Sequence, residues 1–276
     1  KLQKPINSKS PFFLYFSLYG VHAPLMEDNR FVEKYKNIGL ENSEIKYASM
    51  VESMDHALGV VLDELKKNNI LENTIVVFMS DNGGLSAVAR DGERHQHNYP
   101  LKSGKGSIYE GGIRVPMIVY SPFHKTNVKE INHPVIIDDF FPSILEFANL
   151  ENSSLIQEID GQSFVPLLKN KEIDDKPLFW HYPNWWGPSG PGIGSYSAVR
   201  QGEWKFIYFH NTQIMELYNL EKDIFENNNL ISVNNSKSEE LANVLSEYLK
   251  SVDAQMPYNK TTNSIVPWPN EHPVFN

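Results

Sequence analysis

Two uninterrupted apolar runs and one long periodic stretch dominate the first third of the chain. The runs are PFFLYFSLY (11–19) and TIVVFM (74–79), and neither alternates with polar residues. Continuous apolar runs of this length are typical of strands that are buried on both faces. Between them, apolar residues recur every three or four positions from Ser43 to Lys67, which predicts an amphipathic helix. The order strand, helix, strand predicts a βαβ-like unit with a parallel crossover.

A further amphipathic stretch, 135–149, predicts a second helix, and a charged, coil-like segment, 169–176, then interrupts the pattern. Beyond it, short alternating segments predict antiparallel strands and a last helix: a hairpin at 197–210, a strand at 214–220 and a helix at 238–251. We therefore predict an α/β domain over residues 1–172. A small subdomain built on an antiparallel sheet, with a terminal helix, is predicted over residues 173–276.

Composition narrows the classes of partner. The chain has 276 residues, 41% of them hydrophobic, which is enough for a sizeable core. Its net charge of −9 argues against nucleic acid or an anionic membrane surface as the main partner, and no apolar run approaches a membrane span. The absence of cysteine excludes disulfides, thiolate metal sites and a cysteine nucleophile. Because the sequence starts with polar residues and no Met, we expect it to be a piece of a longer protein.

The apolar run 74–79 ends in Ser80-Asp81-Asn82-Gly83-Gly84. A carboxylate beside a carboxamide, at the C-terminal end of a predicted strand, stands where open α/β sheets place their ligands. Both residues offer hard oxygen atoms, which suit Ca²⁺ or Mg²⁺ better than zinc. An Asn-Gly turn capped by the aspartate is the alternative interpretation.

A second candidate feature follows at residues 102–107, KSGKGS. It sets a lysine among glycines, whose exposed N–H groups can approach a tetrahedral anion. The spacing of a P-loop is absent. The next residues, YEGGIRVP, lead into a further apolar strand, Met117 to Tyr120.

Taken together, SDNGG and LKSGKGSIYEGGIRVP, in this order within residues 80–116, resemble the sulfatase family of the alkaline-phosphatase-like superfamily. FLYFSLYGVHAP near the start, and SAVRQGEWKFIYF and ELYNLEKDIFENNNL towards the end, resemble further segments of that family. The resemblance implies an α/β fold with a mixed sheet sandwiched by helices. It also implies a small C-terminal α+β subdomain built on an antiparallel sheet.

The resemblance also implies roles for individual residues. Asp81 and Asn82 would hold a divalent cation, Ca²⁺ in this family. Lys105 and His22 would contact the sulfate or protonate the leaving oxygen, although a lone histidine at a strand end is more often structural. The nucleophile of such sulfatases is a formylglycine made within a Cys/Ser-x-Pro-x-Arg motif, which this sequence lacks. We therefore expect the formylglycine in a preceding part of the protein, and we expect the isolated 276-residue chain to be inactive.

Three further residues are candidates for substrate contacts. His97 lies in a polar loop, where His95-x-His97 also suits a transition metal, although no third nitrogen or sulfur ligand is near in sequence. Trp185 and Trp186 lie in a turn-rich segment and can either stack on a sugar or belong to a core. The pair Asp138-Asp139 is a helix cap or, alternatively, a second metal site.

The favoured hypothesis is a sulfuric ester hydrolase that acts on a sulfated carbohydrate, present here as a fragment. A phosphate or phosphonate monoester hydrolase on the same fold is an alternative, since fold alone does not fix function. A non-catalytic protein that binds sulfated glycans is another. By family resemblance we expect an exported, periplasmic or extracellular, or a lysosomal protein, while the chain itself carries no address signal.

Overall fold

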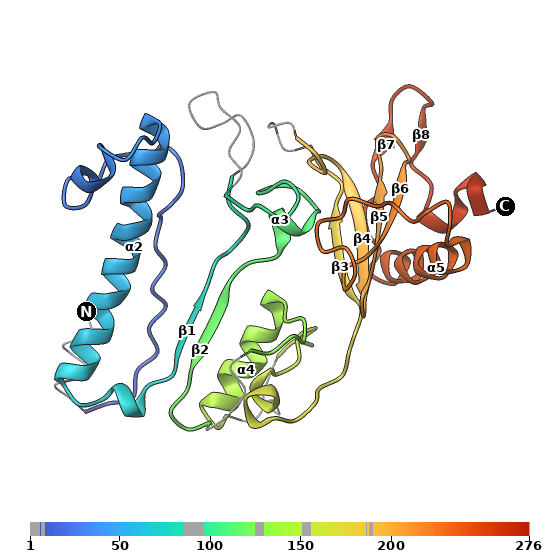
Figure 1. Ribbon diagram of the computed structural model, residues 1–276. Coiled ribbons are helices and arrows are strands. Elements are labelled where there is room, and N and C mark those ends of the chain that lie inside the picture. The colour runs from blue at the N-terminus through green and yellow to red at the C-terminus, as the bar shows by residue number, and fades with distance from the viewer. Residues whose placement is uncertain are drawn as a thin grey trace. The chain divides into compact units, whose positions relative to one another are not determined.

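The structure is a computed structural model that describes residues 6, 9–85, 97–124, 130–150, 156–185, 187 and 190–275. The chain forms two compact units, which are treated separately below. The first unit comprises Lys1–Phe78, Val88–Arg94 and Ile118–Phe123. The second comprises Met79–Ala87, His95–Met117 and His124–Asn276. Figure 1 shows the order of the helices and strands along the chain.

The long helix of the first unit is α2 (Asn42–Lys67), which confirms the helix predicted from Ser43 to Lys67. Glu44 lies in its first turn and two lysines in its last, where each charge complements the helix dipole. The chain leaves the helix through Asn69, whose φ of 56° is the left-handed conformation that asparagine tolerates. Two short 3-10 helices flank it, η1 (Val32–Tyr35) and η2 (Leu71–Asn73).

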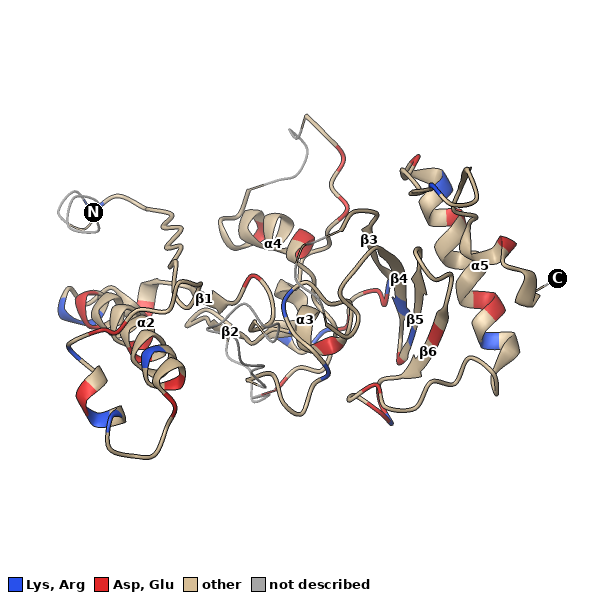
Figure 2. Ribbon diagram, turned by 90° about the horizontal axis from the view of Figure 1, so that it is seen from above, with Lys and Arg blue, Asp and Glu red and all other residues tan. Residues whose placement is uncertain are grey.

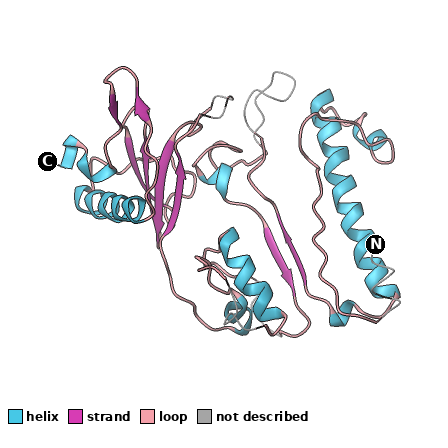
Figure 3. Ribbon diagram, turned by 180° about the vertical axis from the view of Figure 1, so that it is seen from behind, coloured by secondary structure: helices cyan, strands magenta, loops and turns pink. Residues whose placement is uncertain are grey.

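The predicted strand at 11–19 does not form among the described residues. This segment carries no strand assignment (Figure 3). Its aromatic side chains are exposed. A strand exists only when its backbone N–H and C=O groups bond to a neighbouring strand, and among the described residues no such pairing joins this segment to a strand. The predicted βαβ unit is therefore wrong for this chain as it stands.

The run 74–79 does form a strand, β1 (Val76–Met79), and it pairs with β2 (Met117–Tyr120) in a two-stranded sheet. Just beyond β1, the Ser80 N–H donates to the Pro116 carbonyl at 3.4 Å, just before β2 begins. The chain leaves β1 and enters β2 at the same end, so the two strands run in opposite directions (Figure 1). Both strands were predicted from their apolar runs.

The second unit contains a four-stranded antiparallel sheet with the order β3-β4-β5-β6. Its strands are β3 (Leu178–Tyr182), β4 (Tyr196–Gln201), β5 (Trp204–Phe209) and β6 (Met215–Asn219). β4 and β5 form the predicted hairpin, whose turn contains Gly202 at a φ of 58°. A glycine there avoids the steric cost of a positive φ.

Helix α5 (Asn235–Ser251) packs on this sheet (Figure 1). It starts three residues before the predicted Ser238, because the Asn234 side chain accepts from the Lys237 N–H and caps the helix. Leu241, Leu245 and Leu249 enter one core with side chains of the sheet. This confirms the small antiparallel α+β subdomain, whereas its boundary at residues 172 and 173 stays a prediction. Figure 2 shows acidic and basic positions interspersed along α2 and α5.

The remaining elements of the second unit are short. They are α3 (Glu110–Ile113), η3 (Ile137–Asp139), α4 (Phe140–Phe147), η5 (Val165–Lys169), β7 (Tyr258–Asn259), β8 (Ser264–Ile265), η6 (Pro269–Glu271) and η7 (Pro273–Phe275). The buried Asp139 accepts from the N–H groups of Ile136 and Gln162, each at 2.9 Å. Its carboxylate is thus used as a cap, which favours that alternative over a second metal site.

Across the described residues, no helix is both long enough and apolar enough to span a bilayer.

Candidate active site

The turn after β1 leaves the oxygen atoms of Asp81 and Asn82 available. The Ser80 hydroxyl donates to the Asn82 carbonyl at 2.9 Å, and the Asn82 amide nitrogen donates to the Gly83 carbonyl at 2.8 Å. Asp81 is exposed, and no hydrogen bond from a described residue engages its carboxylate. The aspartate therefore does not cap the turn, which counts against the purely structural interpretation.

Close backbone packing requires glycine at Gly83, in this turn, and at Gly111. Gly83 donates its N–H to the Gly112 carbonyl at 2.9 Å, and a Cβ on Gly83 would lie 1.8 Å from the Gly111 carbonyl oxygen. Gly111 in turn donates to the Lys102 carbonyl, and a Cβ there would lie 2.4 Å from that oxygen. Three backbone segments thus meet without side chains between them.

Residues 102–107, called the anion loop below, lie directly against the turn. The Lys105 N–H donates to the Gly84 carbonyl at 3.0 Å. Gly106, the next residue, has a φ of 84°, a conformation that favours glycine. The structure therefore brings together three of the predicted site residues, Asp81, Asn82 and Lys105, in one part of the second unit.

Asn98 was missed by the sequence analysis, although it joins both features. Its side-chain oxygen accepts from the Gly84 N–H at 2.8 Å, and its amide nitrogen donates to the carbonyls of Gly84 and Ser103 at 2.7 and 3.0 Å. A single asparagine in a polar loop carries no motif that would reveal this. Only its location between two backbone segments does.

The segment that follows Trp185 attaches to the end of the anion loop. Ser107 donates its hydroxyl to the Pro191 carbonyl at 2.9 Å and forms an antiparallel bridge with Ile193. The Trp185 side chain is 61% exposed, so it does not belong to a core. Trp186 lies outside the described residues. Trp185 as a sugar contact stays a prediction, and its exposure is what such a role needs.

The two predicted site histidines, His97 and His22, lie in different units of the chain. His97 is exposed and directly precedes Asn98, whereas His95 lies outside the described residues. His22 belongs to the first unit, where its Nδ1 lies 2.6 Å from the Ala23 carbonyl oxygen. A carbonyl can only accept, so Nδ1 carries the hydrogen and Nε2 remains for another partner. Grouping His22 with Asp81 and Lys105 is a prediction from the resemblance.

Asp81 and Asn82 offer the kind of oxygen ligand that a hard cation binds. Two such residues are too few to complete its coordination shell. A carboxylate and a carboxamide oxygen are typical Ca²⁺ ligands, but that ion takes about six to eight oxygens. No group of three or more potential ligands among His, Cys, Asp and Glu occurs in the described part of the chain. Asp81 and Asn82 are therefore suited to supply part of a coordination shell.

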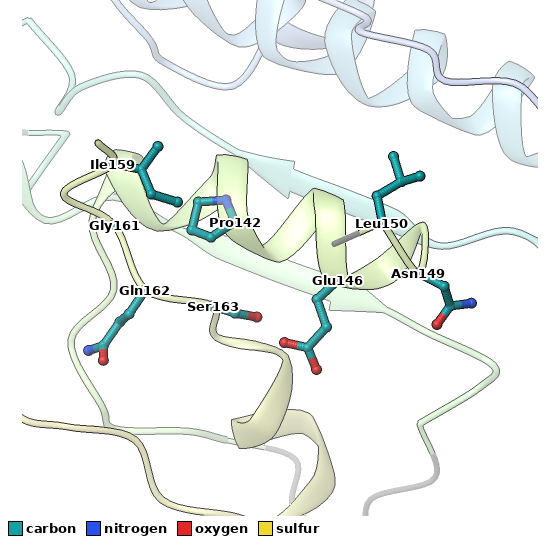
Figure 4. A pocket seen from close by; sticks show the side chains of 8 residues that line it. All are labelled: Pro142, Glu146, Asn149, Leu150, Ile159, Gly161, Gln162 and Ser163. Carbon is teal, nitrogen blue, oxygen red and sulfur yellow. The ribbon is translucent and has the colours of Figure 1, made fainter. Parts of the chain in front are cut away.

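The best-formed pocket of the second unit lies away from these residues, between α4 and residues 159–163 (Figure 4). Its cavity measures about 470 Å³, and none of the predicted site residues lines it. Glu146, the carboxylate in its wall, already pairs with Lys169 at 3.1 Å. The pocket therefore offers no alternative active site.

Comparison with protein families gives two matches. The model described as Sulfatase matches residues 2–150, and the model described as N-sulphoglucosamine sulphohydrolase, C-terminal, matches residues 103–255. Together they run through the candidate site and into the C-terminal sheet.

Individual relatives agree with these matches. A protein named Sulfatase from Formosa agariphila is 33% identical over 249 residues, which cover 84% of this chain and 44% of the relative. The solved structure of Ps i-CgsB in complex with k-i-k-neocarrahexaose has a TM-score of 0.76 and 32% identity, covering 92% of this chain and 53% of that one.

A further solved structure contains its substrate, D-glucosamine-2-N,6-O-disulfate. It has a TM-score of 0.59 and 27% identity, and the match covers 81% of this chain and 45% of that one. The chain thus spans about half the length of the relatives that it matches. The family matches and the motifs at residues 80–84 and 101–116 lead to one conclusion: the chain belongs to the sulfatase family.

Proposed function

We propose that the protein to which this chain belongs hydrolyses sulfate esters. The observation that carries the proposal is that hydrogen bonds join the anion loop to the Asp81 turn. The hydrogen bond from the Lys105 N–H to the Gly84 carbonyl and the bridging side chain of Asn98 hold the backbone of a cationic residue against the turn that carries two hard oxygen donors. Sulfate-ester hydrolysis needs positive charge on the non-bridging oxygens, and this part of the molecule can supply it.

Asp81 and Asn82 are the residues that would hold a divalent cation; their hard oxygens suit Ca²⁺ or Mg²⁺, and the family resemblance favours Ca²⁺. When bound, such a cation neutralises charge on the sulfate oxygens. The half-buried Lys105 would bind a sulfate oxygen or give a proton to the leaving oxygen. His22 would serve the same purpose through Nε2, because its Nδ1 is engaged by Ala23. Losing one such contact typically lowers the rate about 10²–10³-fold.

The nucleophile is proposed to be a formylglycine outside these residues. The 276 residues contain no cysteine and no Ser-x-Pro-x-Arg sequence from which a formylglycine could be made. The chain covers 44% of the Formosa agariphila relative, which leaves room for such a segment elsewhere in the protein.

The proposed substrate is a sulfated carbohydrate. Two of the structural relatives are complexes with a neocarrahexaose and a glucosamine disulfate. In this chain, the exposed Trp185 offers a face for a sugar ring, and its segment is bonded to the anion loop through Ser107. His97 and Trp186 are further proposed contacts. An exported or lysosomal location would give such an enzyme access to sulfated glycans.

The test is an assay of the full-length protein on an aryl sulfate, the matching aryl phosphate and a sulfated oligosaccharide. We expect the sulfate esters to be cleaved, a chelator to remove activity, and Lys105→Ala to lower kcat/KM about 10²–10³-fold. Lys222→Ala, at an exposed lysine of the same unit, is the matched control and should leave the rate unchanged. Preference for the phosphate ester would favour the phosphatase alternative, and absence of turnover would favour the binding protein.

A further inference from the structure

A buried charged cluster joins α3 to the C-terminal sheet within the second unit. The Lys205 side chain, on β5, is fully buried, and its Nζ lies 3.0 Å from Glu110 Oε1 and 2.8 Å from Glu226 Oε1. Glu110 and Glu226 are buried as well, and Arg114 Nε donates to Glu110 Oε2 at 2.6 Å. Lys205 and the two carboxylates thus satisfy one another in the interior, and the exposed Arg114 pairs with Glu110 from the surface. None of them belongs to the site described above.

The same cluster contacts the start of the anion loop and the chain just after it. At the start, Lys102 Nζ donates to the Glu226 carbonyl at 2.9 Å and lies 3.9 Å from the centre of the Tyr109 ring. Three residues beyond the loop, the Glu110 N–H donates to Glu226 Oε2 at 2.7 Å. Tyr109 donates its hydroxyl to Glu216 on β6 at 2.7 Å. Residues of β5, β6 and the turn after β6 therefore bond to the anion loop and to the residues that directly follow it.

The connection continues to the Asp81 turn through backbone bonds alone. Gly111, next to Glu110, donates to the Lys102 carbonyl at 3.0 Å, and the Gly112 carbonyl accepts from Gly83 at 2.9 Å. A shift of Glu110 would therefore move the anion loop and the turn together. The glycines leave no side chains that could absorb such a shift.

The energetics favour a positioning role over a purely stabilising one. Desolvating charges is costly, and an apolar core of similar volume is often at least as stable as a buried ion group. Charged groups add orientation, because each hydrogen bond or ion pair fixes the position of one side-chain atom relative to its partner. Burial raises the pKa of the Glu226 carboxyl, and the charge of Lys205 opposes this only in part. Burial alone would also raise the pKa of Glu110, but Lys205 and Arg114 hold it below its usual value.

We propose that Lys205, Glu110 and Glu226 are positioning residues for sulfate binding, which hold the anion loop and the Asp81 turn in register from the C-terminal sheet. The proposal rests on the proposed function. It assigns the C-terminal subdomain a part in the chemistry, because Lys205 lies on β5 and Glu226 follows β6, and both bond to Glu110 just after the anion loop.

The experiment uses the full-length protein with Lys205→Met, Glu226→Gln and two controls. Lys176→Met removes an ion pair of similar length, to Asp139 at 3.2 Å, outside the cluster. Leu245→Ala destabilises the same subdomain through its core without contacting the loop. The readouts are kcat and KM on an aryl sulfate, well below the unfolding temperature, and hydrogen exchange of peptides covering the anion loop.

For Lys205→Met we expect kcat/KM to fall about a hundredfold, mainly through kcat, and exchange in the anion loop to rise. Glu226→Gln keeps the volume and an acceptor for the Glu110 N–H, so about a tenfold fall is expected. Both controls should stay within about twofold in kcat/KM. If the Lys205→Met variant does not fold, the Glu226→Gln variant alone tests the proposal.

Unchanged kinetics and unchanged loop exchange in both cluster variants would overturn the proposal. An equal loss in Leu245→Ala would overturn it too, because the effect would then be one of stability. If the unaltered protein cleaves no sulfate ester, the proposed function fails, whereas hydrogen exchange still decides whether the cluster anchors the loop.

Discussion

Two segments of the chain are both rich in aromatic residues but differ in structure: one is exposed, and the other forms a buried strand. FFLYFSLY, within the N-terminal segment, is extended and exposed, with Phe13 at 72% and Tyr15 at 81%. WKFIYF forms β5, where Phe206, Ile207 and Tyr208 are fully buried. β5 has strand neighbours on both sides and α5 packed on the sheet, whereas the N-terminal segment pairs with no strand among the described residues. Apolar character thus gives a segment the capacity to be a strand, and pairing decides whether it becomes one.

Exposed apolar surface of this extent marks a surface that contacts something else. For the N-terminal segment, the proposed partner is the remainder of the protein, since the relatives are about twice as long as this chain. The predictions below contrast this segment with the C-terminal sheet.

The largest effect is expected from separating the chain from the rest of the protein. Residues 1–276 alone should show no turnover of an aryl sulfate, because the proposed nucleophile and part of the cation shell lie elsewhere. The measurement compares this chain with the full-length protein at equal concentration. Ordinary turnover by residues 1–276 would contradict the proposed formylglycine.

A matched pair of substitutions tests burial directly. In residues 1–276, Phe206→Ala should lower the free energy of unfolding of the C-terminal sheet by about 3–5 kcal/mol, because it leaves a cavity. Phe13→Ala should cost less than about 0.5 kcal/mol. Urea unfolding measures both. In the full-length protein, a cost of several kcal/mol for Phe13→Ala would show that its side chain becomes covered there.

The C-terminal sheet also buries a histidine that should make its stability depend on pH. Burial, with a smaller contribution from the charge of His181, lowers the pKa of His210 to about 3. Its ring nitrogens bond to the hydroxyls of Ser195 and Ser197 at 2.7 and 2.8 Å. The folded state thus favours the neutral ring, whereas the unfolded chain takes up a proton near pH 6.5.

Stability from His210 is therefore fully present above about pH 6.5 and is lost progressively as the pH falls towards 3. Between pH 7 and pH 5 the loss should be about 2 kcal/mol. Urea unfolding at the two pH values gives the number. His210→Gln is the control, in which this difference should shrink, and an unchanged difference would assign the pH dependence to other groups.

The smallest effect concerns an exposed aromatic side chain that lies outside any apolar run. Trp185→Ala in the full-length protein should raise KM for a sulfated oligosaccharide about fivefold, since stacking on one sugar contributes roughly 1 kcal/mol. KM for a small aryl sulfate should change little. Equal changes for the two substrates would indicate that Trp185 supports the loop and does not contact the sugar.

The chemistry of the candidate site could be predicted largely from sequence, because it depends on residue types at short spacing. Asp81, Asn82 and Lys105 stand in motifs, and the glycines around them are required by backbone contacts that no other residue allows. The helices at 42–67 and 235–251 and the hairpin at 196–209 were equally predictable, since their periodicity and caps are local.

Only the tertiary structure decided which residues hold the site together. Asn98, Lys205, Glu110 and Glu226 act across separations of up to 124 residues, and no local pattern records which buried charge meets which. The tertiary structure likewise left residues 11–19 without strand pairing, against their apolar pattern. The physical reason is the same in both cases. Hydrogen bonds and ion pairs between distant segments depend on which segments meet, whereas turns, caps and amphipathic faces depend on neighbours along the chain.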